Sequence, residues 1–191
     1  MDWEQLYQEN DIGWDRGAIS PALKHWLPTL KENKHQRILI PGCGYGHEVI
    51  ELASQGYDVT GLDIAPSAIK QLDENLKKKN LSATTVCEDL FNYHPTQIFD
   101  AMYEQTCLCT IPSAKRKYYE HAVFNWLKQG GSLMILLMQT GTLSGPPFHV
   151  GLLSARQMFD ESRWLWPDTP PVLIPRPKGG RFELSFILEK K

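Results

Sequence analysis

The chain has 191 residues, enough for one domain with a sizeable core, and 42% of its residues are hydrophobic. Its formal net charge of -2 argues against a general nucleic-acid binder, which needs a basic surface. No apolar run is long enough to span a bilayer, and the acidic, aromatic residues 1–4 do not form a secretory signal. We therefore expect a cytoplasmic protein without a membrane or nucleic-acid partner.

The four cysteines are Cys43, Cys87, Cys107 and Cys109. Their spacing does not match a zinc site, and Cys107 and Cys109 are too close for a tetrahedral clip. Three of them lie in or beside predicted strands, which indicates buried free thiols. We expect no bound metal and a reducing compartment.

The first 20 residues are aromatic and polar, with Trp3, Tyr7 and Trp14 spaced along them. A short helix is predicted after Asp2, and Ser20 followed by proline is typical of a helix start. Two interpretations of the aromatic residues stay open. They either pack onto the domain as part of its core, or they form a lid that closes over a ligand and excludes water.

A strand at residues 37–41, a glycine-rich turn and a new helix follow in that order. Gly42, Gly44 and Gly46 alternate in this turn, where glycine allows a positive φ and a close approach of a ligand to the backbone. The dinucleotide fingerprint would place its third glycine where this chain has His47. A phosphate-binding P-loop is also excluded, because no Lys-Ser or Lys-Thr pair follows. The turn predicts a nucleotide-like ligand.

Further strands alternate with helices along the chain. The predicted strands cover residues 37–41, 57–63, 83–87, 98–103, 132–138, 172–174 and 182–188. Four helices are predicted after the glycine turn. The first ends at Gly56, and the second begins around Pro66. The third begins at a Ser113 cap and ends at Gly130-Gly131, and the fourth begins at a Ser154 cap. A turn at residues 178–180 joins the last two strands as a hairpin.

This order predicts a single domain over residues 1–191, with residues 1–20 as a possible lid. The fold class is α/β, doubly wound and Rossmann-like, with a mostly parallel seven-stranded sheet. One antiparallel strand enters that sheet from the C-terminal hairpin. The continuous apolar run at residues 132–138 is typical of a strand buried on both faces.

Acidic residues stand at the ends of three predicted strands. Asp63 comes about 20 residues after the glycines, where a nucleotide-binding unit places its ribose-binding carboxylate. Alternatively, Asp63 is an N-cap for the next helix, Asp89 is a turn former and Glu104 is a surface carboxylate.

The motifs together resemble the class I S-adenosylmethionine-dependent methyltransferases, and within them the thiopurine S-methyltransferase superfamily, which includes plant thiol and halide methyltransferases. The resemblance spans nearly the whole chain. It rests on residues 41–46 (PGCGYG), 59–69 (VTGLDIAPSAI), 89–91 (DLF), 127–131 (LKQGG) and 145–150 (GPPFHV), and on the N-terminal tryptophans. Glu48 and Gln105 depart from the family pattern, which leaves the methyl acceptor open.

The resemblance implies S-adenosyl-L-methionine as cofactor and S-adenosyl-L-homocysteine as product. Asp63 would bind the ribose hydroxyls, Asp89 the adenine amine and Glu104 the methionine portion, while Trp14 would cover the sulfonium. The implied cofactor-binding residues are Trp3, Trp14, Pro41, Gly42, Cys43, Gly44, Gly46, Asp63, Ile64, Asp89, Leu90, Phe91 and Glu104.

The implied acceptor is a small soft nucleophile: a thiol, a thiopurine, a halide or a metalloid anion. Candidate acceptor-pocket residues are Tyr7, Gln105, His149, Arg176 and Arg181, none of them assigned a catalytic step. Two other functions stay open at this stage, a non-catalytic cofactor-binding protein and a nicotinamide-dependent reductase. We expect a monomer or a weak dimer.

Overall fold

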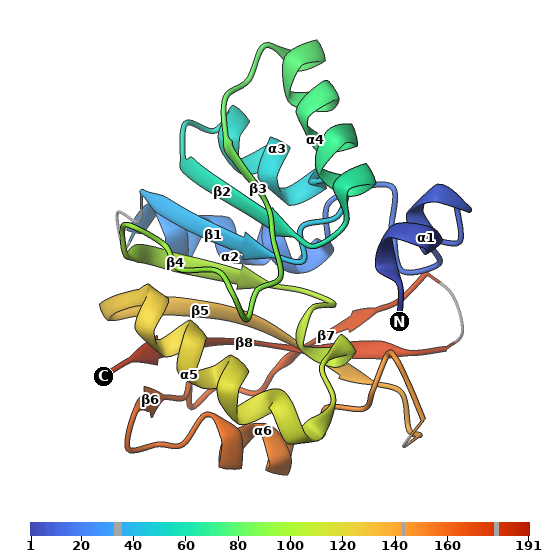
Figure 1. Cartoon of the computed structure of the whole chain (residues 1–191). Coiled ribbons are helices and arrows are strands. Elements are labelled where there is room, and N and C mark those ends of the chain that lie inside the picture. Colours follow the sequence, from blue (N-terminus) through green and yellow to red (C-terminus); the bar gives the residue numbers. More distant parts are fainter. Residues whose placement is uncertain (33–35, 143, 178–179) are drawn as a thin grey trace. The chain divides into compact units, whose positions relative to one another are not determined.

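The computed structural model describes residues 1–32, 36–142, 144–177 and 180–191. The chain divides into two compact parts, residues 1–94 and residues 95–191 (Figure 1). Within the described ranges, no helix combines the length and apolar composition needed to cross a membrane.

Three parallel strands form the sheet of the first part. Their order is β3 (Thr84–Cys87), β2 (Asp58–Asp63) and β1 (Arg37–Pro41). All residues of β1 except the first are buried, as are all residues of β2 except the first. This burial agrees with parallel strands that are covered on both faces.

The helices of the first part begin and end close to the predicted positions. They are α1 (Trp3–Gln8), α2 (Pro21–Glu32), α3 (His47–Ser54) and α4 (Pro66–Lys79). The Asp2 carboxylate accepts a hydrogen bond from the Gln5 N–H at 3.1 Å, and the Ser20 hydroxyl accepts one from the Ala22 N–H at 3.2 Å. Both predicted helix starts are therefore confirmed, because each cap satisfies a backbone donor that the helix leaves free.

Helix α4 packs beside β2 and β3 (Figure 1). Its buried residues are Ala68, Ile69, Leu72 and Leu76, which recur at three- and four-residue spacing and so share one face. The three lysines of its last turn are exposed and lie at the negative end of the helix dipole. Asn80 then ends the helix with a φ of 54°.

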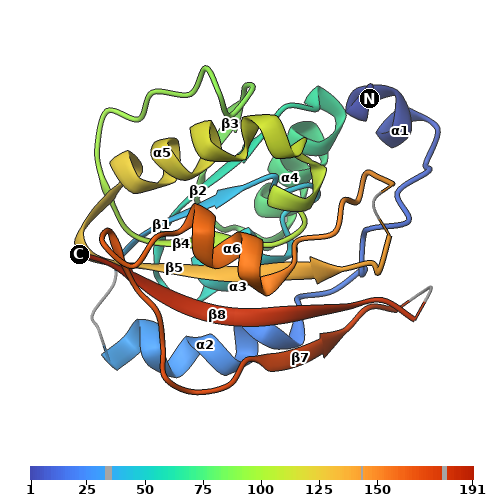
Figure 2. The ribbon, with the colours of Figure 1, turned by 90° about the horizontal axis from the view of Figure 1, so that it is seen from below.

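The second part contains the remaining strands, and Figure 2 shows β5, β8 and β7 side by side. The strands are β4 (Phe99–Glu104), β5 (Leu127–Gln139), β6 (Trp164–Leu165), β7 (Val172–Pro175) and β8 (Phe182–Lys190). Strand β4 pairs with β5 in parallel, whereas β8 runs antiparallel to β5, β6 and β7. The helices are the 3-10 turns η1 (Leu108–Thr110) and η2 (Ser113–Lys115), α5 (Arg116–Trp126) and α6 (Leu152–Met158).

The α/β fold class, with mostly parallel strands and one antiparallel hairpin strand, is confirmed. Each predicted strand is present, and β6 is an additional one. Two residues are too few to show the alternation by which strands are recognised in a sequence. The predicted hairpin turn includes Lys178 and Gly179, which lie outside the described residues.

Three predicted boundaries in the second part are wrong. Ser113 begins a 3-10 turn, not α5, and gives no side-chain cap. Helix α5 ends at Trp126, so Gly130 and Gly131 belong to β5, where the φ of 70° at Gly130 favours glycine. Helix α6 begins at Leu152, and the Ser154 hydroxyl donates to the Gly151 carbonyl from inside its first turn.

The prediction of buried thiols holds for Cys43, Cys107 and Cys109 but is wrong for Cys87, which is exposed. Strand β3 lies at the edge of the three-strand order, and its residues are only half-buried or exposed. The faces of an edge strand are less completely covered than those of a central strand, which agrees with the exposure of Cys87 at its end.

Candidate cofactor site

The glycine turn (residues 42–46) joins β1 to α3. Gly42, Gly44 and Gly46 all have positive φ, at 61°, 54° and 74°. A Cβ atom on Gly46 would lie 2.2 Å from a methyl of Leu72, so a larger residue there would have to displace the Leu72 side chain as well as adopt a positive φ. A Cβ on Gly44 would lie 2.9 Å from the Tyr7 hydroxyl oxygen. The turn therefore presents bare backbone, the property that admits a nucleotide-like ligand.

Asp63 ends β2 beside this turn and is 7% exposed. Its Oδ2 accepts a hydrogen bond from the Gly44 N–H at 2.8 Å, and its Oδ1 accepts one from the Ala65 N–H at 3.0 Å. Burial raises the pKa of Asp63, and these N–H donors oppose the rise. The N-cap of α4 is Ala65, so Asp63 is not that cap. Its carboxylate is held against the glycine turn.

An aromatic cover, made of Trp3, Tyr7 and Trp14, packs within the first part. The Trp14 ring meets the rings of Trp3 and Tyr7 edge-on, at centroid distances of 5.4 and 5.6 Å. The Trp14 Nε1–H donates to the Tyr7 hydroxyl at 3.4 Å, and the Tyr7 ring lies 5.2 Å from the Tyr45 ring of the glycine turn. Burial, with the charge of Asp63, raises the pKa of Tyr7, which stays a neutral phenol.

Helix α1 is bound to the start of α4 through Glu4. One carboxylate oxygen accepts from the Ser67 N–H at 2.8 Å and the other from the Ser67 hydroxyl at 2.6 Å. The hydrogen bonds from Ser67 lower the pKa of Glu4. A carboxylate at a helix N-terminus also interacts favourably with the helix dipole, so Glu4 holds the aromatic cover against α4.

Asp89 folds the turn that follows β3. Its Oδ1 accepts from the Phe91 N–H at 2.9 Å, and its carbonyl accepts from the Asn92 N–H at 2.8 Å. This is the turn-forming arrangement that the sequence left open for Asp89. Ile64 is 48% exposed, whereas Pro41 and Cys43 are buried. Burial raises the pKa of the Cys43 thiol.

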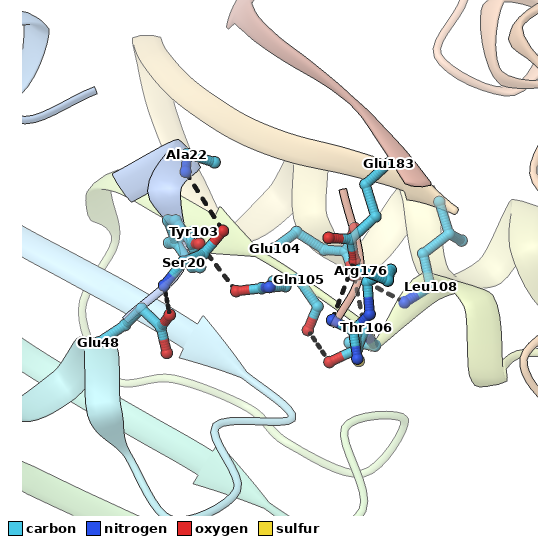
Figure 3. A network of polar contacts seen from close by, with 11 residues as sticks. Ser20, Ala22, Glu48, Tyr103, Glu104, Gln105, Thr106, Leu108, Arg176 and Glu183 are labelled. Carbon is cyan, nitrogen blue, oxygen red and sulfur yellow. Dashed lines mark hydrogen bonds and ion pairs between the residues drawn. The ribbon is translucent and has the colours of Figure 1, made fainter. Parts of the chain in front are cut away.

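Glu104 is fully buried at the end of β4 in the second part (Figure 3). Its Oε1 accepts from the N–H groups of Cys107 at 3.0 Å and Leu108 at 2.7 Å. Its Oε2 has no hydrogen-bond partner in the part of the chain that the structure describes. Burial raises the pKa of Glu104 to about 8, and the two N–H donors oppose that rise. The surface interpretation of Glu104 is therefore wrong.

A buried ion pair lies in the same part, between Arg176 and Glu183. Arg176 Nη1 is 3.5 Å from Glu183 Oε1, and neither side chain is more than 8% exposed. The backbone N–H of Arg176 donates to the carbonyl of Arg181, whose side chain is exposed. Of the two arginines predicted for the acceptor pocket, one is thus buried in a pair and the other faces solvent.

The other acceptor candidates of the second part are also held in place. The Tyr103 hydroxyl donates to Gln105 Oε1 at 2.9 Å. Next to Gln105, Thr106 has a φ of 60°, a strained conformation for a β-branched residue. His149 Nδ1 accepts from the backbone N–H groups of Thr140 at 3.2 Å and Gly141 at 3.3 Å. Tyr7, the remaining candidate, lies instead on the glycine turn of the first part.

Sequence reasoning missed the contacts made by the first turn of α3. His47 and Glu48 reach the chain segment between α1 and α2, where they contact Asp15 and Ser20. The one available signal was a histidine in the place of the third fingerprint glycine. It excluded a dinucleotide site without indicating a partner. Glu183 was likewise indistinguishable from an ordinary strand residue.

Parallel strands, a glycine turn with three positive φ values and an acid at the end of β2 form a Rossmann-like fold of the kind found in class I methyltransferases. Solved structures share this fold. An N1-methyltransferase of Burkholderia thailandensis with bound S-adenosylhomocysteine matches with a TM-score of 0.77 at 16% identity, over 100% of this chain and 86% of that one. A magnesium protoporphyrin IX methyltransferase of Synechocystis matches with a TM-score of 0.74 at 12% identity, over 97% and 91%.

The family model for thiopurine S-methyltransferase matches residues 1–165. Thiocyanate methyltransferase 1 of Arabidopsis thaliana is 33% identical over 160 residues, 82% of this chain and 70% of that protein. A thiopurine S-methyltransferase of Xanthomonas campestris is 30% identical over 175 residues, 82% and 80% of the two chains. The chain belongs to the thiopurine S-methyltransferase family. It is an S-adenosylmethionine-dependent methyltransferase that acts on a small molecule.

Proposed function

We propose that this enzyme transfers the methyl group of S-adenosylmethionine to a small soft nucleophile. A thiol, a thiopurine or thiocyanate is the favoured class, and a halide or metalloid anion is the alternative. The observation that supports this proposal is the glycine turn with Asp63 at its side and the aromatic cover on Gly44. The relatives named for thiocyanate and thiopurine methylation support the choice of sulfur.

The residues present fit an adenosyl sulfonium. Asp63 has the two carboxylate oxygens that a ribose diol requires, and both now accept backbone N–H groups beside the turn. The rings of Trp3 and Trp14 would face a sulfonium with a cation–π interaction worth about 0.5–2 kcal/mol. We assign cofactor contacts to Trp3, Trp14, Pro41, Gly42, Cys43, Gly44, Gly46, Asp63, Ile64, Asp89, Leu90, Phe91 and Glu104.

The bound cofactor supplies an electrophilic methyl carbon on a positively charged sulfur. Attack by the acceptor's lone pair on that carbon would break the carbon–sulfur bond and leave a neutral thioether, while Asp63 and the glycine turn would hold the adenosyl portion in place. The leaving group needs no proton, so the chain's task is to hold the reactants in line, which contributes roughly 7–11 kcal/mol. Burial and nearby Glu104 raise the pKa of the Cys109 thiol, which disfavours the thiolate that a cysteine nucleophile requires.

A thiol acceptor reacts as its anion, so a nearby cation or base would assist it. We propose Tyr7, Gln105, His149, Arg176 and Arg181 as the residues from which the acceptor pocket is drawn.

We also propose that residues 1–191 act as one methyltransferase domain, with residues 1–20 as a lid. A cytoplasmic monomer or weak dimer without a nucleic-acid partner fits the slight negative charge and the free cysteines.

Calorimetry with S-adenosylhomocysteine tests the cofactor assignment. The wild-type protein is expected to bind it with a micromolar dissociation constant. Asp63→Ala is expected to weaken binding at least about tenfold, because charged hydrogen bonds contribute roughly 1.5–3 kcal/mol. Asp58→Ala is the matched control, since Asp58 lies at the other end of β2 and its exposed carboxylate contacts Arg37. Equal binding by both variants would contradict the ribose assignment.

A screen of acceptors tests the substrate class. Thiocyanate, small thiols, thiopurines, iodide and tellurite are each incubated with cofactor, and the release of S-adenosylhomocysteine is measured. Turnover with a sulfur nucleophile is the expected result. Binding of the cofactor without turnover on any of these acceptors would exclude the proposed class.

A further inference from the structure

His47 and Asp15 form a contact between the first residue of α3 and the segment that carries Trp14. The His47 Nε2 lies 2.9 Å from Asp15 Oδ1, and the side chains are 29% and 16% exposed. The same oxygen of Asp15 accepts from the Gly17 N–H at 2.7 Å, which closes a turn directly after Trp14. Asp15 thus links α3 to the backbone that positions the aromatic cover.

A second contact from α3 fixes the far end of this segment. The Glu48 carboxylate accepts from the Ser20 N–H at 2.8 Å, just before α2 begins (Figure 3). Two adjacent side chains of α3 therefore hold the segment at Asp15 and at Ser20. From Asp15 the contacts continue through Trp14 to the Tyr7 hydroxyl, which lies against Gly44.

The His47–Asp15 contact favours a protonated His47 and an ionised Asp15. The hydrogen bond to Asp15 raises the pKa of His47, and burial opposes the rise. Burial would raise the pKa of Asp15, but the bonds from His47 and Gly17 bring it below its ordinary value. The other charged groups acting here are Glu48, which also raises the pKa of His47, and Arg16, which acts on Glu48.

A cation at the first residue of a helix is unfavourable, because the N-terminus is the positive end of the helix dipole. This unfavourable interaction is the same whether the segment is docked or not, so the Asp15 carboxylate is what makes the docked state favour protonated His47. When the segment that carries Asp15 undocks, His47 remains at the positive end of the α3 dipole but no longer contacts the Asp15 carboxylate. The proton on His47 and the docked segment consequently stabilise each other.

We propose that His47 is a positioning residue which, through Asp15, holds Trp14 and Tyr7 over the glycine turn and makes retention of the cofactor depend on pH. The inference rests on the proposed function, because it assigns the aromatic cover to the cofactor.

The pH range follows from the direction of the two shifts. Docking raises the pKa of His47 above its ordinary 6.5, so this stabilisation is complete below about pH 6.5 and is lost as pH rises through the raised value. Docking lowers the pKa of Asp15, so the stabilisation that ionised Asp15 contributes is present above pH 3.8, the ordinary pKa of an aspartate. It is lost only on further acidification. Cofactor affinity should therefore fall from pH 6 towards pH 8.5.

The test is calorimetric binding of S-adenosylhomocysteine to the full chain between pH 6 and 8.5. The wild type should lose about two- to fivefold in affinity across this range, as expected for a partly exposed ion pair. His47→Gln and Asp15→Asn should each weaken binding at pH 6 and flatten the profile. The double variant should be no weaker than either single one, because both remove the same contact.

His25→Gln is the matched control, since His25 is exposed on α2, and its profile also records the titration of the ligand itself. An independent readout is the NMR titration of the His47 ring, whose pKa should fall in Asp15→Asn. Variants that keep the wild-type profile, or that bind more tightly, would overturn the inference while leaving the proposed function intact. A wild type that does not bind at any pH would overturn the proposed function and this inference with it.

Discussion

At the scale of single residues, Glu104 shows how burial changes the behaviour of a carboxyl group. It lies at 0% exposure with two N–H donors on one oxygen and none from the described residues on the other. The raised pKa of about 8 means that the folded protein keeps Glu104 protonated well above the ordinary value of 4.5. A protonated carboxyl oxygen can donate a hydrogen bond, whereas an ionised one can only accept.

Glu104→Gln is predicted to flatten the pH dependence of stability. Because its folded pKa is raised, the contribution of Glu104 is fully present below pH 4.5 and is lost as pH rises through about 8. Glutamine keeps the acceptor for Cys107 and Leu108 but cannot ionise. Urea unfolding at pH 5, 7 and 8.5 measures the effect, with exposed Glu74→Gln as control. A variant whose stability falls as steeply as the wild type's would contradict the prediction.

At the scale of elements, α1 depends on another helix for its place. Six residues are too few for a stable isolated helix, so its order must come from its cap at Asp2 and from its contacts. Glu4 supplies a contact between elements by accepting two hydrogen bonds from Ser67 of α4. Glu9, by contrast, bonds to Gln5 one turn earlier in the same segment.

Glu4→Gln is predicted to loosen α1 from α4 without unfolding the domain. The amide lacks the charge that the N-terminus of α4 favours, so the N–H groups of residues 3–8 should exchange with solvent several-fold faster. Hydrogen exchange measured by mass spectrometry reports this change directly. Glu9→Gln serves as the control, because the Glu9 side chain accepts from Gln5 of the same segment, and equal exchange in both variants would refute the role of Glu4.

At the scale of the whole molecule, the family match and the cofactor requirement predict ligand-linked stability. A ligand that binds the folded chain alone raises its stability by about 2.7 kcal/mol at a concentration of 100 times its dissociation constant. S-adenosylhomocysteine should therefore raise the melting temperature, whereas NADH and NADPH should not. A thermal shift with the nicotinamide cofactors alone would contradict the assignment. Asp58→Ala should retain the shift, and Asp63→Ala should lose most of it.

Sequence alone determined the order of the elements, because local periodicity and glycine chemistry set strands and helices independently of distant contacts. The buried strands, the glycine turn and Asp63 at the end of β2 were predictable in this way. The predicted helix starts at Ser113 and Ser154 were wrong. A cap motif is short, so several neighbouring residues could begin the helix, and tertiary contacts determine which of them does. The edge position of Cys87 likewise depends on strand order, which no local pattern records.

Only the tertiary structure decided which side chains meet. It brought Tyr7 onto Gly44, which lies 37 positions further along the chain, and His47 onto Asp15, at a separation of 32. It also buried Glu104 and paired Arg176 with Glu183. The physical reason is that charge pairing and burial depend on distances in space, whereas a sequence records distance along the chain. Local sequence patterns therefore determine the fold class, whereas the electrostatics of the site arise from the packing of segments that are distant in the sequence.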